Sequence, residues 1–193
     1  MSNFTKLVKA SIETKKRLFK IEKKVNRAVD LMTNTILNGG KVMLCGNGGS
    51  AADAQHLAAE FLIRLRPKVN RKAIPVFSLA MESSTLTACG NDFSFVDIFD
   101  RPFNAFANQQ DLLITISTSG NSKNILKVLS SAKKKKVKSI SFLGSNGGKA
   151  KGIANLDIIV PSKVTARIQE CHIMLGHYIF EQTEDNLINK NFI

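Results

Sequence analysis

Two short segments of the chain combine small residues with hydroxyl and amide side chains, directly after a run of aliphatic or β-branched residues. They are Gly46–Ser50 and Ser117–Ser122. In such a segment, small residues let the backbone approach an anion, and hydroxyls donate to its oxygens. The first amides of a following helix point toward the same anion. Two segments of this kind in one chain predict a site for a phosphorylated substrate.

The two segments differ in strength as signals. Gly46–Ser50 alone could be a Gly-rich turn between a strand and a helix, capped by Ser50. It lacks the Lys-Ser/Thr ending of a P-loop and the spacing of a GxGxxG fingerprint, so no nucleotide cofactor is expected. Ser117–Ser122 carries four hydroxyls within six residues, which exceeds what one helix cap needs. We therefore favour this second segment as the phosphate site.

Candidate acid and base groups lie in two helical stretches. His56 and Glu60 are four residues apart, so they share a helix face, and apolar neighbours make Glu60 a candidate for a partly buried general base. An ordinary surface pair would have the same spacing. Gln169 and His177 lie about 80° apart around the last helix, although a core histidine and a surface amide remain an alternative. His172 lies about 140° from His177, so we expect it to contribute to packing or to support the site residues from behind.

The same residues could hold a metal. Two histidines, one glutamate and one glutamine offer nitrogen and oxygen ligands that Zn²⁺ accepts, although glutamine is an unusual partner for it. Residue types alone leave both the metal site and a metal-free acid/base pair open.

Alternating strand and helix patterns predict an α/β fold with a doubly wound, five-stranded parallel sheet flanked by helices. The expected strands are 41–45, 73–79, 111–116, 137–143 and 156–160. The expected helices are 4–38, which can contain one break, 50–65, 84–89, 95–108, 122–135 and 165–189. We expect a single domain over 1–193, with a core at about 41–161 between long terminal helices that favour an oligomer. Ligands of such sheets bind beyond the carboxyl ends of the strands, where both segments lie.

Composition narrows the function classes. The net charge is +13, and the lysines concentrate in residues 1–30 and 133–136, where solvated helix faces account for them. With one Tyr, no Trp and no nucleic-acid module, we expect no nucleic-acid partner. No uncharged stretch is long enough to span a bilayer, and the N-terminal residues lack a signal peptide's apolar segment, so we expect a cytoplasmic protein without a membrane partner. Cys45, Cys89 and Cys171 are expected to be buried thiols.

Several motifs in one order resemble the sugar isomerase (SIS) fold family and, within it, the sedoheptulose-7-phosphate isomerases, also called phosphoheptose isomerases. The motifs are Gly46–Ser50, Cys89–Phe93, Ile116–Ser122, Gly147–Lys149 and Arg167–Glu170 with His177. The likeness extends from about residue 4 to residue 185. It implies conversion of sedoheptulose 7-phosphate to D-glycero-D-manno-heptose 7-phosphate by proton transfer through an enediol. That reaction begins the synthesis of ADP-heptose precursors for lipopolysaccharide or related glycans.

The resemblance also implies roles for individual residues. Glu60 and His177 would be the catalytic acid/base pair. A Zn²⁺ ion, one per subunit, would be held by His56, Glu60, Gln169 and His177. The sugar phosphate would contact Asn47, Gly48, Gly49, Ser50, Glu60, Asn91, Asp92, Ser117, Thr118, Ser119, Ser122 and Gln169, with the phosphate on Ser117, Thr118, Ser119 and Ser122. The assembly would be a homotetramer with its sites between subunits.

The chain differs from some relatives at Ala166 and from a non-enzymatic relative in its acid/base pair. Some family members have Asp where this chain has Ala166, so this chain lacks that carboxylate. A non-enzymatic relative that binds a replication initiator has the same sequence as residues 166–170 but lacks the acid/base pair. In this chain Glu60 and His177 are both present. A phosphosugar-binding or partner-binding module without activity is therefore the alternative, and isomerisation of another sugar phosphate is a second one.

Overall fold

The structure is a computed structural model that describes residues 1–80 and 82–193. Five parallel strands form one sheet in the order β2-β1-β3-β4-β5. The strands are β1 (Val42–Gly46), β2 (Val76–Ser78), β3 (Leu112–Ser117), β4 (Lys138–Gly144) and β5 (Leu156–Val160). The helices are α1 (Asn3–Lys16), α2 (Glu22–Leu37), α3 (Gly49–Leu62), α4 (Ser83–Asp92), α5 (Asp100–Phe106), α6 (Lys123–Lys134) and α7 (Thr165–Asn189). Two 3₁₀ turns, η1 (Arg17–Ile21) and η2 (Gly148–Ala150), complete the elements of the described residues.

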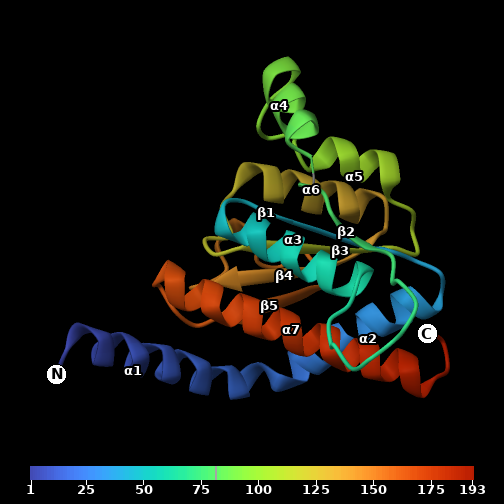
Figure 1. The fold of residues 1–193 in the computed structure, drawn as a ribbon. Coiled ribbons are helices and arrows are strands. Elements are labelled where there is room, and N and C mark those ends of the chain that lie inside the picture. The colour runs from blue at the N-terminus through green and yellow to red at the C-terminus, as the bar shows by residue number, and fades with distance from the viewer. Residues whose placement is uncertain (81) are drawn as a thin grey trace.

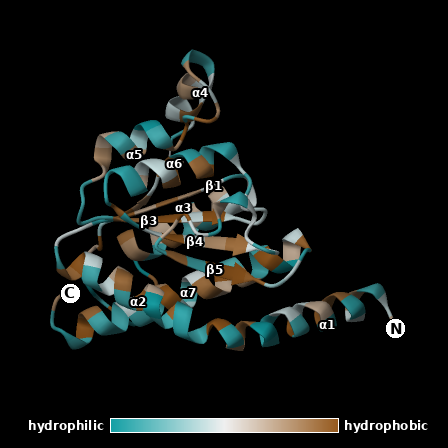
Figure 2. Ribbon diagram, turned by 180° about the vertical axis from the view of Figure 1, so that it is seen from behind, coloured by the Kyte–Doolittle hydropathy of each residue, from teal (hydrophilic) through white to brown (hydrophobic). Residues whose placement is uncertain are grey.

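Helices cover both faces of the sheet (Figure 1). Successive side chains of a strand point to opposite faces, so Val42 and Leu44 of β1 pack with α2, α3 and α7, whereas Met43 and Cys45 pack with α5 and α6. Figure 2 shows the hydrophobic strands enclosed between these two layers. The predicted doubly wound parallel sheet is confirmed.

Most element predictions are confirmed, including the single break of the long N-terminal helix, which is η1 between α1 and α2. The predicted strand 73–79 is wrong in its extent, because β2 begins only at Val76. The amide of Ile74 donates to the carbonyl of Phe61 (3.2 Å) instead of to a strand, and Pro75 has no amide hydrogen. β2 is an edge strand, as Pro75 suggests.

The predicted helices 84–89 and 95–108 are also wrong in their bounds. Residues 90–92 continue α4 instead of separating two helices, since a lone Gly90 costs a helix only about 1 kcal/mol. α5 begins later than expected, because the Ser94 hydroxyl accepts from the amide of Val96 (2.9 Å) and holds a turn there. The remaining strands and helices lie within a few residues of their expected bounds.

Two peripheral features follow from the same structure. In the chain as described over 1–80 and 82–193, every helix is too short or too polar to cross a membrane. Cys45, Cys89 and Cys171 are free and buried, which confirms the prediction for the thiols.

α3 and α7 run side by side in the same direction across one face of the sheet (Figure 1). Three contacts along their length define this arrangement: Gly49 with Gln169, Leu57 with Gly176, and Phe61 with Phe180, whose ring centroids lie 4.4 Å apart. A Cβ atom added to Gly176 would lie 2.5 Å from Cδ1 of Leu57, which is itself only 1% exposed. The absent side chain at Gly176 therefore lets the two helices approach closely.

Gly176→Ala should destabilise the fold by about 1–3 kcal/mol, because the new methyl group overpacks against Leu57. In a Leu57→Ala background, where the space is free, the same change should have almost no effect on the free energy of unfolding. Urea denaturation of the four proteins of this cycle measures both effects. Equal losses in the two backgrounds would contradict the close-approach role of Gly176.

Candidate active site

Three ionisable side chains converge where the middle of α3 meets α7. His56 and Glu60 come from α3, one turn apart, and His177 comes from α7. Nε2 of His56 lies 2.9 Å from Nε2 of His177 and 3.4 Å from Oε1 of Glu60. The structure therefore brings together the predicted acid/base residues, which are separated by more than one hundred positions in the chain.

The two histidines have an arrangement that a cation would suit. Their Nε2 atoms face each other, so either one carries a proton and the other accepts it, or both lone pairs point at one shared positive ion. One ligand atom each of His56, Glu60 and His177 lies within 4.8 Å of the others. Imidazole nitrogen and carboxylate oxygen are ligands that Zn²⁺ prefers. The residues present fit the metal that the resemblance implies.

Asp53, which was not among the predicted site residues, lies one turn before His56 on α3. Its Oδ2 atom is buried and has no hydrogen-bond partner among the described residues. Burial raises the pKa of Asp53, while the nearby imidazoles of His56 and His177 act in the opposite direction. An orphaned carboxylate oxygen beside two imidazoles also favours positive charge at this point. The spacing of three residues before His56 was the available sequence signal.

Gln169 lies at the other end of the helix pair. A Cβ atom added to Gly49 would collide with Nε2 of Gln169, so the Gln169 side chain rests on the first residue of α3. His177 lies about 12 Å further along α7, from eight residues at the helical rise. The contact of Gln169 with the first segment supports its predicted sugar contact. Its predicted part in the metal site stays a prediction.

The first segment folds as a turn between β1 and α3. Helix α3 begins at Gly49, and Gly48 occupies the cap position with a φ of 56°, a conformation that favours glycine. In the alternative interpretation of this segment Ser50 caps the helix, but Ser50 lies within the first turn and its amide donates to the carbonyl of Asn47 (3.0 Å). Ser50 is almost fully buried there.

The second segment borders a polar cavity of about 360 Å³. Thr118 and Ser119 line it, together with residues that the sequence analysis did not select: Asn121, Ser145, Asn146, Lys163 and Thr165. The hydroxyl of Ser117 is turned inward and accepts from the amide of Gly120 (3.1 Å). Lys163 would add a positive charge beside an anion. Its position in the loop before α7 gave no sequence signal.

A pair of asparagines joins the two segments. Asn47 and Asn124 exchange two side-chain hydrogen bonds of 3.0 and 2.8 Å, and Oδ1 of Asn124 also accepts from the amide of Ile125 (2.9 Å). Asn124 is only 2% exposed, so this pair is shielded from water. The two predicted substrate segments are therefore fixed relative to each other.

Asn91 and Asp92 lie together near the end of α4, the helix that stands away from the body of the molecule in Figure 1. Their side chains bond to each other at 2.7 Å. Asp92 lines a different and mostly apolar cavity of about 480 Å³, with Phe77, Arg101 and Phe106. The predicted sugar contacts of these two residues stay predictions.

Known proteins resemble this chain in sequence over nearly its whole length. The SIS domain family matches residues 4–144. A phosphoheptose isomerase of Clostridium acetobutylicum is 44% identical over 195 residues, covering 98% of this chain and 98% of the relative. The chain belongs to the phosphoheptose isomerase family. A phosphoheptose isomerase of Helicobacter pylori strain P12 is also 44% identical, and the match covers 92% of this chain and 91% of the relative.

Solved structures agree with this assignment to the phosphoheptose isomerase family. The phosphoheptose isomerase of Francisella tularensis superposes with a TM-score of 0.90 at 31% identity, covering 96% of this chain and 100% of that one. The phosphoheptose isomerase of Neisseria gonorrhoeae gives 0.87 at 35% identity, covering 94% and 97%. The resemblance that the motifs carried is confirmed.

One histidine of this phosphoheptose isomerase family member lies outside the cluster. His172 of α7 is fully buried, where Nε2 lies 3.0 Å from the carbonyl oxygen of Leu143 and the ring packs near Phe142. Burial lowers the pKa of His172 from its ordinary 6.5 to about 4, opposed in part by the bond to Leu143. The expected packing role is confirmed.

This lowered pKa makes stability depend on pH. Below pH 6.5 the unfolded chain protonates His172 and the folded chain does not until about pH 4, so stability falls as the pH falls through this window. The loss attributable to His172 should reach about 3 kcal/mol. His172→Gln should remove it, so that its unfolding free energy falls less steeply from pH 6.5 to 4 than that of the wild type in urea denaturation. Parallel curves would contradict this assignment.

Proposed function

We propose that this chain interconverts sedoheptulose 7-phosphate and D-glycero-D-manno-heptose 7-phosphate. The observation that supports the proposal is that His56 contacts both Glu60 and His177, so that the two proposed acid/base residues lie together on α3 and α7. The polar segments lie near the other end of these two helices, where Gln169 contacts Gly49. Relatives named phosphoheptose isomerase support the choice of substrate. The product would enter the synthesis of ADP-heptose precursors for lipopolysaccharide or related glycans.

The chemistry needs one group that moves a proton between two neighbouring carbons. Glu60 removes the proton from the carbon beside the carbonyl, leaving a cis-enediol, and returns it to the adjacent carbon. His177 assists ring opening and moves protons at the oxygens. Glu60 suits the first task because its side chain is 20% exposed, half-buried among the apolar residues of α3, yet reachable.

The phosphate end supplies orientation. Thr118 and Ser119 donate hydroxyls and Lys163 brings a positive charge at the polar cavity. The binding energy of a remote phosphate can be used to hold the reacting carbons against Glu60. Asn47 would contact the sugar next to this end, and its two hydrogen bonds to Asn124 hold it in place.

A zinc ion is part of the proposal. His56, Glu60 and His177 would hold it, and it would polarise the carbonyl as a Lewis acid. Gln169 rests on Gly49 in this structure, so it would become the fourth ligand by turning its side chain along α7 toward His177. A carboxylate has two oxygens, so Glu60 can contact a metal with one and accept a proton with the other.

We also propose that the protein works as a cytoplasmic homotetramer without nucleic-acid or membrane partners. An apolar groove of about 660 Å³ runs between η1, α2 and α7 and includes Phe19, Met174 and Tyr178. Phe4, Leu7 and Ile12 add exposed apolar surface on α1, which extends from the body in Figure 2. Surface of this kind supports contacts between subunits.

Glu60→Gln and His177→Gln should each lower kcat on sedoheptulose 7-phosphate by about 10²- to 10⁴-fold, because each removes a proton-transfer group. Product formation followed by NMR measures the rate. The controls are Glu181→Gln and His172→Gln, which make the same chemical changes at α7 residues outside the cluster. Both controls should retain activity. Near-normal turnover in either test variant would remove that residue from the mechanism.

The choice of substrate is decided in the same assay. Sedoheptulose 7-phosphate should have a higher kcat/KM than pentose or hexose phosphates measured side by side. A better pentose or hexose phosphate would replace the proposed substrate. Complete inactivity of folded wild-type protein on all of them would favour a binding module instead.

The metal proposal predicts the composition of the purified protein. Elemental analysis should find one zinc ion per subunit in the wild type and in His172→Gln. His56→Ala should lose most of the metal, because removal of one ligand weakens such a site strongly. Equal zinc content in His56→Ala and wild type would contradict the site.

A further inference from the structure

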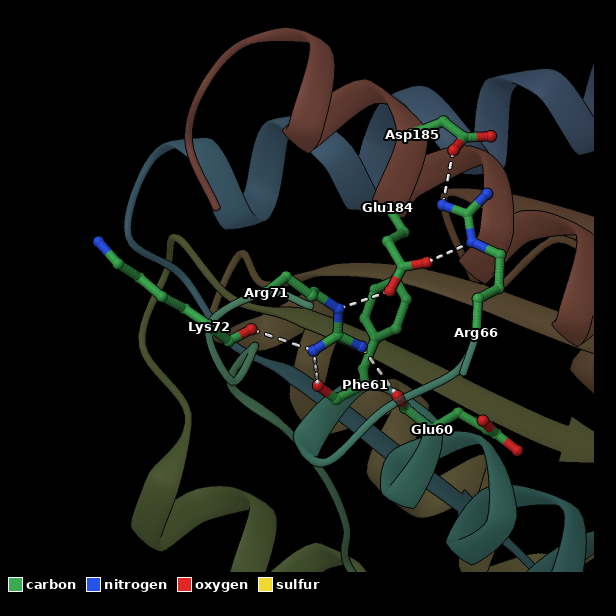
Figure 3. Close-up of polar contacts among 7 residues, drawn as sticks. All are labelled: Glu60, Phe61, Arg66, Arg71, Lys72, Glu184 and Asp185. Atoms are coloured by element: carbon green, nitrogen blue, oxygen red, sulfur yellow. Dashed lines mark hydrogen bonds and ion pairs between the residues drawn. The ribbon is translucent and has the colours of Figure 1, made fainter. Parts of the chain in front are cut away.

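A buried cluster of opposite charges joins the end of α3 to α7, outside the groups used in the reaction (Figure 3). Arg66 and Arg71 lie in the segment between α3 and β2, and both donate to the carboxylate of Glu184 on α7. Glu184 is fully buried and the side chain of Arg71 is 1% exposed, whereas that of Arg66 is 31% exposed and also donates to Asp185 (2.6 Å). Glu184 therefore has its charge compensated from two sides.

Of these two arginines, Arg71 also donates to the backbone of α3. Its NH2 group donates to the carbonyl of Glu60 (2.9 Å), and its NH1 group donates to the carbonyl of Phe61 (2.8 Å). These carbonyls belong to the last turn of the helix, whose oxygens lack partners within the helix. A cation at this end also favours the helix dipole. The side chain of Arg71 thus caps α3 at Glu60 itself.

The same guanidinium therefore ties two helices that each carry part of the cluster. Glu184 lies seven residues, about two turns, after His177 on α7. Arg71 connects its carboxylate to the residue that we assign as the proton shuttle. A shift of one helix along the other by a single residue is about 1.5 Å. Displacements of about 1 Å from productive geometry can reduce a rate by about 10².

We propose that Arg71 and Glu184 are positioning residues that fix the axial register of α3 against α7, and through it the geometry of Glu60, His56 and His177. This inference rests on the proposed function for its kinetic readout. A purely structural ion pair would instead change stability without a specific effect at the cluster.

The matched test is Arg71→Lys against Arg66→Lys. Both keep a positive charge beside Glu184, but lysine cannot reproduce the fork that reaches two α3 carbonyls and the carboxylate together. Arg71→Lys should lower kcat on sedoheptulose 7-phosphate by about 10-fold or more, with KM within about twofold because the phosphate end is unchanged. Arg66→Lys should leave both constants near wild type. Equal kinetics in the two variants would overturn the proposal.

A second measurement is independent of activity. The chain has three histidines, so ¹⁵N-histidine labelling gives three imidazoles to follow by NMR in the full-length protein. Arg71→Lys should shift the signals of His56 and His177 and leave that of His172, which serves as an internal reference in the core. Arg66→Lys should shift none. Unchanged His56 and His177 signals in Arg71→Lys would overturn the proposal.

The two readouts separate this inference from the proposed function. If the wild type has no isomerase activity, the proposed function fails, and the imidazole signals still decide on the positioning role. If Arg71→Lys does not fold, Glu184→Gln carries the same expectations, because it keeps the shape of the side chain and one acceptor oxygen but removes the charge. Glu184→Gln with wild-type kcat and unshifted His56 and His177 signals would overturn the proposal.

Discussion

The close parallel packing of α3 on α7 is the constraint on which the rest of the site depends. Gly176 permits it, since any side chain there would meet Leu57, and the tilted contact between the rings of Phe61 and Phe180 continues it. Because the helices run in the same direction, each successive turn of one faces a successive turn of the other. Gln169 meets the start of α3 and His177 meets its middle. One helix contact therefore sets the positions of both ends of the site.

Separation of the two ends suits the proposed reaction. The polar cavity at Thr118 and Ser119 lies at the carboxyl edge of the sheet, where parallel strands leave room for ligands. The ionisable cluster lies further along α3, about 10 Å from its first residue by the helical rise over seven residues. In the proposed reaction, an extended seven-carbon sugar phosphate would have to reach from one end to the other. A phosphate held at one end then orients the carbons at the other, without itself taking part in the chemistry.

Sequence patterns predicted what depends on local periodicity and on motifs. The parallel sheet, the long terminal helices and the His56–Glu60 helix face all follow from spacing, and the structure confirms them. One error arises where a tertiary bond overrides the local pattern, and the others where a turn or a glycine takes a local conformation that the pattern did not specify. Ile74 looks like part of a strand but gives its amide to Phe61. The alternative cap at Ser50 does not form, because Gly48 occupies the cap position with a positive φ.

Residues that act through long-range contacts had no sequence signal. The role of each depends on residues far away in the chain. Lys163 lines the polar cavity with Thr118 and Ser119, Asn124 bonds to Asn47, and Glu184 accepts from Arg71. A charged or amide residue in such a position looks like ordinary surface until the fold is known. Asp53 is an intermediate case, since its spacing from His56 was visible but its burial was not.

Exposure of the cluster connects the chemistry to the proposed assembly. In the single chain the side chain of His56 is 48% exposed, and that of Glu60 is 20% exposed. Proton transfer at carbon benefits from a site that excludes water, because water weakens electrostatic stabilisation and leads to side reactions. Substrate and a neighbouring subunit would together cover this surface, and the apolar residues of α1 and η1 supply a means of assembly. The N-terminal helix α1 is bonded to α7 at the same time, since Glu170 of α7 accepts from the hydroxyl of Ser11 (2.9 Å). Assembly through α1 would thus also bear on α7, the helix that carries His177.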